Sequence, residues 1–191
     1  IRQMIKENKL GPVQSAVGYY VRGIRHNCCL IINLLRFFFG EIKTVQVFGP
    51  AKKGSYGKEP SLNFYTETRN GLGANIIAMD QQGYGFSIFE VDLAFKKGRL
   101  RITDGAQKIE FYEPKKSKVF SNFKVLSLSK SKFRNPTYGQ AMLNAESEIT
   151  NYLDSKNQKI QNNATDAYKD LQIIDAVMKS AKSNNRKITI L

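Results

Sequence analysis

The stretch Tyr19–Gly40 reads YYVRGIRHNCCLIINLLRFFFG and contains the only histidine and both cysteines of the chain. Its first residues, two tyrosines and an arginine, are typical of the end of a strand, and Gly23 breaks that pattern. The sequence places a helix start at His26-Asn27, where the asparagine is a residue type that caps helix N-termini. The apolar run that follows leaves almost no polar face. It predicts a helix that is buried on most sides and ends at Gly40.

The segments around this helix predict an α+β protein. A short helix over Ile1–Lys9 and a strand over Val13–Arg22 precede it. After Gly40 the hydrophobic period changes to two, and closely spaced turns such as Asn70-Gly71 indicate an antiparallel meander. The strands expected in this meander are Ile42–Phe48, Ser61–Thr68, Gly71–Met79, Gly85–Phe95, Arg99–Thr103, Gln107–Tyr112, Val119–Phe123 and Lys124–Leu128. Helices over Thr137–Leu153 and Asp166–Lys182 and a strand over Lys187–Leu191 complete the chain, with Asn163 or Thr165 as the cap of the last helix.

Composition and charge narrow the possible partners. The chain has 191 residues and a formal net charge of +14, which fits either an anionic partner or a basic surface that keeps the protein in solution. The basic residues are spread over many short segments, which favours the second interpretation. Cys28 and Cys29 are adjacent, lack the spacing of metal ligands, and are expected in the core of a protein in a reducing compartment.

Nothing in the sequence indicates a membrane protein. The longest apolar run, Cys28–Phe39, is shorter than the roughly 20 residues that a membrane-spanning helix needs. No signal peptide is visible, so we expect a cytoplasmic protein with no membrane partner. The first residue is Ile1 instead of Met, which suggests a fragment of a longer protein.

Three pieces of the sequence resemble one known family. LGPVQSAVGYYVRGIRHN with LLRFFFGEI, FEVDLAFKKGRLRITDGAQKIEFYEP, and ATDAYKDLQIIDAVMKSAKSNNRKITI follow one another in the chain. They resemble the C-terminal domain of the Gfo/Idh/MocA family, the glucose–fructose oxidoreductases and inositol dehydrogenases. The resemblance implies a large, mostly antiparallel open sheet with helices on one face, as in the C-terminal domain of dihydrodipicolinate reductase. It also implies that residues 1–191 form one substrate-binding and oligomerisation domain of a longer two-domain chain.

In that family the cofactor, NAD or NADP, is bound mainly by an N-terminal Rossmann domain. The segment GLGAN at Gly71–Asn75 lacks the third glycine of a dinucleotide fingerprint and lies between expected strands, so it does not predict such a site. Lys58-Glu59-Pro60 has the residues of the family's Glu-Lys-Pro motif in another order and in the wrong domain. It is interpreted as a coincidence.

The resemblance places the catalytic question at the start of the buried helix. Aligning on LLRFFFG puts His26 at a family Asp, Leu30 at the family's acid/base His, and Asn33 at a later Asp. Leu30 cannot transfer a proton. His26 is therefore the candidate general base, because an imidazole can accept a proton near neutral pH. The alternative is that His26 is an ordinary polar residue at a helix start.

Other residues of the same stretch are candidates for substrate contact. Arginine can hold a phosphate or carboxylate through two parallel hydrogen bonds, and a helix start offers free N–H groups. For the tyrosines, packing within the strand is an equally good interpretation. The candidate substrate-binding residues are Tyr20, Arg22, Arg25, Asn27 and Asn33.

Three functions remain open at this stage. The first is a domain of an NAD(P)-dependent oxidoreductase acting on a CH–OH group of a sugar, nucleotide sugar or cyclitol, inactive by itself. The second is a catalytically altered relative that binds a sugar or a partner without turnover, favoured by Leu30. The third is a polyanion or nucleic-acid module, which rests on the charge alone. Because the strands carry apolar residues that would lie on both faces, we expect homo-oligomers through the open sheet.

Overall fold

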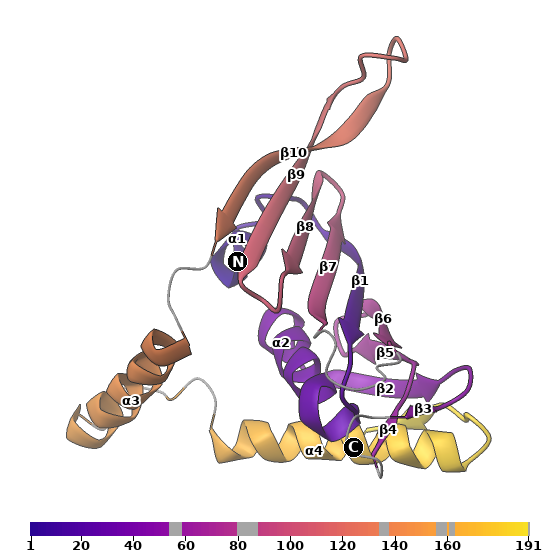
Figure 1. The fold of residues 1–191 in the computed structure, drawn as a ribbon, viewed down its shortest axis with the longest axis vertical. Helices are drawn as coiled ribbons and strands as arrows, with labels where there is room; N and C mark the ends of the chain where they lie inside the picture. Colours follow the sequence, from indigo (N-terminus) through magenta and orange to yellow (C-terminus); the bar gives the residue numbers. More distant parts are fainter. Residues whose placement is uncertain (54–58, 80–87, 134–137, 156–159, 161–162, 191) are drawn as a thin grey trace.

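The computed structural model describes residues 1–53, 59–79, 88–133, 138–155, 160 and 163–190. A nine-stranded sheet with the order β10-β9-β8-β7-β1-β6-β5-β2-β11 dominates the fold (Figure 1). Its strands are β1 (Val13–Tyr20), β2 (Ile42–Val47), β5 (Phe64–Thr68), β6 (Gly73–Ala78), β7 (Phe89–Phe95), β8 (Gly98–Thr103), β9 (Lys108–Lys116), β10 (Lys124–Phe133) and β11 (Ile188–Thr189). Only the β1–β6 pair is parallel among the described strand pairs. The predicted α+β class with a mostly antiparallel open sheet is confirmed.

In the part of the chain that the structure describes, the remaining elements are five helices and a small second sheet. β3 (Lys52–Lys53) pairs with β4 (Pro60–Ser61) outside the main sheet. The helices are α1 (Arg2–Lys6), the π-helical turn η1 (Ile24–Cys28), α2 (Cys29–Phe39), α3 (Tyr138–Ser155) and α4 (Ala164–Lys182). None of the described helices is both long and apolar enough to cross a bilayer.

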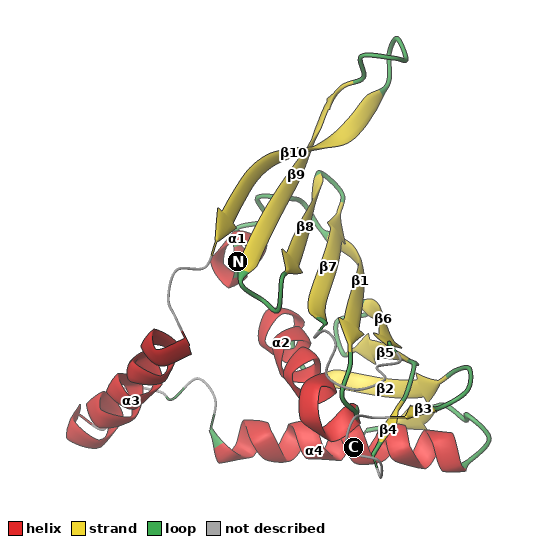
Figure 2. Cartoon of the chain, viewed as in Figure 1, coloured by secondary structure: helices red, strands yellow, loops and turns green. Residues whose placement is uncertain are grey.

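Helices α2 and α4 share one hydrophobic core with the sheet (Figure 2). Strand β1 has α2 so close above it that a Cβ atom built on Gly18 would lie 2.7 Å from Cγ2 of Ile31. A larger side chain at position 18 would therefore push the helix away from the sheet. α4 begins with the predicted cap: the Asn163 side chain accepts from the Asp166 N–H, and Asp166 returns the bond in a capping box.

Several expected strands differ from the structure. The strand expected over Ser61–Thr68 is divided between β4 and β5, and the one expected over Lys124–Leu128 continues to Phe133 as β10. Val119–Phe123 belongs to the turn between β9 and β10. The Ser117 N–H donates to the Phe123 carbonyl at 2.9 Å, and this hydrogen bond closes the turn. The strand expected over Gly85–Phe95 begins at Phe89, and residues 85–87 lie outside the described part of the chain.

The face of β7, β8 and β9 away from the helices is polar, so the expectation of apolar residues on both faces of these strands is wrong. Arg101 lies 3.8 Å from Glu90, 3.7 Å from Asp92 and 3.7 Å from Glu110. Lys108 pairs with Glu110 at 2.7 Å, and Arg99 pairs with Asp92. The physical reason is strict alternation: Val91 and Leu93 face the helices while the carboxylates between them face outward.

A buried arginine joins α2 to α4. Arg36, whose side chain is 5% exposed, donates through Nη1 to Asp170 Oδ1 at 2.6 Å and to the Asp166 carbonyl at 2.9 Å. Its Nε and Nη2 donate to the two carboxylate oxygens of Glu41 at 3.0 and 3.2 Å. Lys169 from α4 also donates to Glu41, at 2.8 Å. These bonds fix the C-terminal end of α2 against the N-terminal half of α4.

We expect Arg36→Met to lower the free energy of unfolding by about 3 kcal/mol, because it leaves the buried Asp170 carboxylate without its cation. Arg25→Met is the matched control, since the Arg25–Asp175 pair is exposed on both sides and such pairs contribute about 0–1 kcal/mol. Urea denaturation of both variants measures the difference. Equal losses would contradict a structural role for the Arg36 cluster.

Acid should weaken the same cluster. The hydrogen bonds from Arg36, followed by those from Lys169, lower the pKa of Glu41 from 4.5 to about 2. Since the pKa is lower in the folded state, Glu41 stabilises the fold above about pH 4.5, and this contribution is lost as the pH falls toward 2. We expect Glu41→Gln to flatten the dependence of unfolding free energy on pH over this range. If the slope of unfolding free energy against pH is unchanged in Glu41→Gln, Glu41 does not contribute to the loss of stability in acid.

Candidate functional site

The turn from β1 into α2 has an unusual backbone. Arg22 lies in the left-handed region with φ of +73°, and Gly23 follows with φ of +92°. The next five residues form the π-helical turn η1 before α2 begins at Cys29. Strained backbone and π-turns both occur frequently at functional sites. We call residues 20–30 the β1–α2 corner.

The expected capping role of Asn27 is wrong. Asn27 lies inside η1, where its N–H donates to the Gly23 carbonyl at 3.3 Å, and neither η1 nor α2 has a side-chain cap. The reason is that η1 starts at Ile24, before Asn27, so this residue no longer precedes the first helical turn. The start of the helix is instead held from another part of the chain.

Two residues of the small second sheet's β4 region hold the corner: Glu59, just before β4, and Ser61, within it. The Arg25 N–H donates to Glu59 Oε1, and the Gly23 N–H donates to Ser61 Oγ at 3.1 Å. A Cβ atom on Gly23 would lie 2.7 Å from the carboxyl carbon of Glu59, so a larger residue there would have to displace this carboxylate as well as adopt a positive φ. Glu59, interpreted from sequence as part of a coincidental motif, is thus a structural partner of the corner. Lys58 lies outside the described residues.

The candidate site residues of the β1–α2 corner differ in how deeply they are buried. Tyr20 is fully buried; its hydroxyl donates to the Leu62 carbonyl and accepts from the Leu62 N–H, both at 2.8 Å. Burial raises the pKa of Tyr20 and also that of the buried Cys28 thiol. The structure therefore places both residues in the packing of the corner and not on its surface, as expected for Cys28.

The remaining candidates lie nearer to solvent. Arg25 and His26 are exposed, and Arg22 and Asn27 are half-buried. Arg25 also pairs with Asp175 of α4 at 3.2 Å, and the carbonyl of His26 accepts from the Cys29 thiol at 3.1 Å. Within residues 20–30 the side chains that can meet a bound molecule are accordingly basic or neutral, and the carboxylates of Glu59 and Asp175 lie beside them.

Sequence reasoning missed one further cation near the corner. Lys52 of β3 donates through Nζ to the Ala78 carbonyl at 2.5 Å, and Ala78 is the register partner of Tyr20 in β6. The signal for it was present only as the pair Lys52-Lys53 in an expected loop. A cation from a third element therefore lies at the same ends of the central strands.

Leu30 and Asn33 follow on the outer side of α2. The Leu30 side chain is 53% exposed and lines an apolar pocket of about 570 Å³ with Leu34, Phe37 and Phe38. Asn33 donates to Asp170 at 2.8 Å. The structure thus places Asn33 beside the Arg36 cluster and away from the basic corner.

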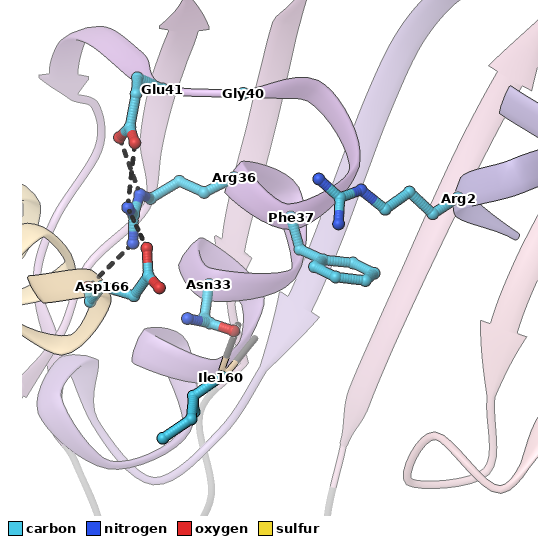
Figure 3. Close-up of a pocket in the computed structure, with 8 residues that line it drawn as sticks. All are labelled: Arg2, Asn33, Arg36, Phe37, Gly40, Glu41, Ile160 and Asp166. Carbon is cyan, nitrogen blue, oxygen red and sulfur yellow. Dashed lines mark hydrogen bonds and ion pairs between the residues drawn. The ribbon is translucent and has the colours of Figure 1, made fainter. Parts of the chain in front are cut away.

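A second pocket, of about 430 Å³, adjoins Asn33 (Figure 3). Figure 3 shows Arg2 lying over the ring of Phe37, with 4.5 Å from the guanidinium carbon to the ring centroid, while Arg36 points toward Glu41 and Asp166. Because Arg36 is already bound by carboxylates, this pocket offers little for an anion.

The described residues do not form a phosphate cradle of the dinucleotide type. Gly71 lies in the turn between β5 and β6, and Gly73 already belongs to β6, so Gly71–Asn75 does not open a helix. This agrees with the sequence interpretation of that segment.

The chain matches solved structures by its fold, but no family model and no curated protein sequence matches it. Among solved structures, levoglucosan dehydrogenase in complex with NADH and L-sorbose superimposes with a TM-score of 0.76 at 10% identity, over 100% of this chain and 61% of that one. An oxidoreductase domain protein from Kribbella flavida gives 0.76 at 12%, over 100% and 61%. An oxidoreductase from Agrobacterium radiobacter with NAD+, L-tartaric acid and magnesium gives 0.68 at 14%, over 99% and 60%.

The chain therefore shares its fold with part of each of these oxidoreductases. They are of the Gfo/Idh/MocA type, so the resemblance stated from the sequence is confirmed at the level of the fold. The chain spans about 60% of the length of the structures it matches.

Replacing Gly23 tests how the corner is held. Gly23→Ala should lower the free energy of unfolding by about 2 kcal/mol, because the methyl group meets the Glu59 carboxylate and φ is positive. Gly71→Ala is the matched control: its φ is +83°, but a Cβ atom there meets nothing within 4 Å. Thermal or urea denaturation should show a clearly larger loss for Gly23→Ala. Equal losses would mean that backbone strain alone, and not Glu59, requires the glycine.

Proposed function

We propose that this chain is the substrate-binding domain of an NAD(P)-dependent oxidoreductase that acts on a CH–OH group of a sugar, nucleotide sugar or cyclitol. The observation that carries the proposal is the strained β1–α2 corner, which presents His26 and Arg25 within the fold shared with sugar dehydrogenases. The proposal includes a second domain that binds NAD or NADP. By itself the domain is expected to be inactive.

Each exposed residue of the corner has a proposed task. A nicotinamide cofactor, when bound, supplies the acceptor for the hydride that leaves the carbinol carbon. His26 accepts the proton of the substrate hydroxyl. Arg22, Arg25 and Asn27 bind substrate oxygens, and the nearby Lys52 adds positive charge. An anionic sugar derivative, such as a nucleotide sugar, therefore fits this corner better than a neutral sugar.

A second candidate function rests on Leu30. This exposed leucine stands where the resemblance places the acid/base histidine, and it borders an apolar pocket. A relative that binds a sugar or another protein without redox turnover would have this arrangement. The two candidates differ in what His26 and Leu30 do during turnover.

The test uses the longer protein that contains this chain, assayed for NAD(P) reduction against sugars, sugar acids and nucleotide sugars. We expect His26→Ala to lower kcat about 100-fold or more with little change in KM, because it removes a proton acceptor and not a binding group. Lys179→Ala, an exposed change on α4, is the control that should leave both constants unchanged.

Three outcomes separate the candidates. Loss of kcat in His26→Ala supports the dehydrogenase with His26 as base. Unchanged turnover in that variant removes His26 from the mechanism. Absence of turnover in the wild type, with sugar binding detectable by calorimetry and turnover appearing in Leu30→His, supports the catalytically altered relative.

A further inference from the structure

Strands β9 and β10 form an arm that extends beyond the neighbouring strands (Figure 1). Its tip, Ser117–Phe123, is a closed turn. Ser117 N–H donates to the Phe123 carbonyl at 2.9 Å, and Ser117 Oγ accepts from the N–H groups of Val119 and Phe120 at 3.1 and 3.0 Å. The tip is therefore held in one shape by its own hydrogen bonds.

This closed turn presents apolar side chains to solvent. Val119 is 81% exposed, Phe120 63% and Phe123 67%. The two phenylalanine rings touch edge to face, with centroids 6.3 Å apart, so they form a single apolar cap. Large apolar side chains gathered at the end of a projecting arm indicate a surface that contacts another protein or a membrane.

Exposed lysines flank the apolar cap along the chain, and we call Lys115, Lys116, Lys118 and Lys124 the lysine collar. Every charged residue from Lys115 to Lys132 is a lysine. Lys115, Lys116 and Lys118 precede the cap, Lys124 follows it, and all four are exposed. Lysine side chains of this kind place their charge at the level of lipid headgroups while their alkyl stems lie along apolar neighbours.

We propose that the tip of the β9–β10 arm inserts its apolar cap into the surface of an anionic lipid bilayer, with the lysine collar bound to acidic headgroups. Burial of exposed phenylalanine and valine side chains and attraction of each lysine to acidic lipid both favour this contact. This proposal departs from the sequence-based expectation of no membrane partner, which rested on the missing membrane-spanning run and the missing signal peptide. The inference is independent of the proposed oxidoreductase function.

Other occupants fit the tip less well. A second copy of the chain carries the same charge of +14, so docking the lysine collar on it would bring like charges together. Single-stranded nucleic acid binds in basic grooves with aromatic platforms. The tip instead is the end of an arm, and it includes the aliphatic Val119, with Leu126 and Leu128 exposed on β10 behind it.

Vesicle sedimentation tests the proposal with the chain as it is. We expect binding to vesicles of phosphatidylcholine and phosphatidylserine in equal amounts, and little binding to phosphatidylcholine alone. The variant Val119→Ser/Phe120→Ser/Phe123→Ser should bind at least tenfold more weakly. The matched control Met142→Ser/Leu143→Ser/Leu153→Ser removes three exposed apolar side chains from α3 and should bind as the wild type does.

The lysine collar has its own comparison. Lys115→Gln/Lys116→Gln/Lys118→Gln should weaken binding to the anionic vesicles at least tenfold, since each lysine contributes roughly fivefold near an acidic surface. Lys6→Gln/Lys179→Gln/Lys182→Gln removes the same charge from exposed positions outside the arm and should have a much smaller effect.

The absence of tryptophan from the chain allows a direct readout of insertion. Phe120→Trp places a single indole in the cap, and its emission should shift to shorter wavelength with anionic vesicles. Tyr152→Trp, on α3, should show no such shift.

Any of four results would overturn the proposal. Three concern vesicles: no binding to anionic vesicles, equal binding by the cap variant, or no spectral shift in Phe120→Trp. The fourth is that the cap variant loses binding to a single-stranded oligonucleotide or to a second copy of the chain, but keeps its binding to vesicles.

Discussion

The carboxylate of Glu59 accepts a hydrogen bond from the backbone of Arg25, across 34 residues of sequence, and lies directly on Gly23. That contact holds the two successive positive φ angles and the π-helical turn from a distant segment of the chain. With it, and with Ser61 bonded to the Gly23 N–H, the direction in which α2 leaves β1 is fixed from the small β3–β4 sheet. The position of His26 follows from that direction.

The other end of α2 is held just as firmly. Gly18 lets the helix lie directly on β1, and Arg36 ties its last turn to Glu41 and to α4. A helix fixed at both ends and packed on the central strands is a rigid base for the exposed residues of the π-helical turn that precedes it. Rigid positioning is what a general base and substrate-binding groups require.

Much of the fold could be predicted from the sequence, because period-two segments and buried runs are local signals. The apolar run after Asn27 gave α2, and Asn163 with Asp166 gave the start of α4. The corner could not be predicted in the same way. Its π-turn and its glycine depend on Glu59, and a contact between distant segments leaves no local pattern. The apolar residues Val119–Phe123 were expected in a strand, whereas the side-chain bonds of Ser117 turn them into a loop tip.

Amide hydrogen exchange at the corner, followed by NMR, tests most directly whether Glu59 holds it. The Gly23 and Arg25 amides should exchange slowly in the wild type, and Glu59→Ala should accelerate exchange at Arg25 while the amides that pair β2 with β5 keep their protection. Rapid, unprotected exchange of Gly23 and Arg25 in the wild type would contradict the account, because the corner would then not be held in the conformation that positions His26.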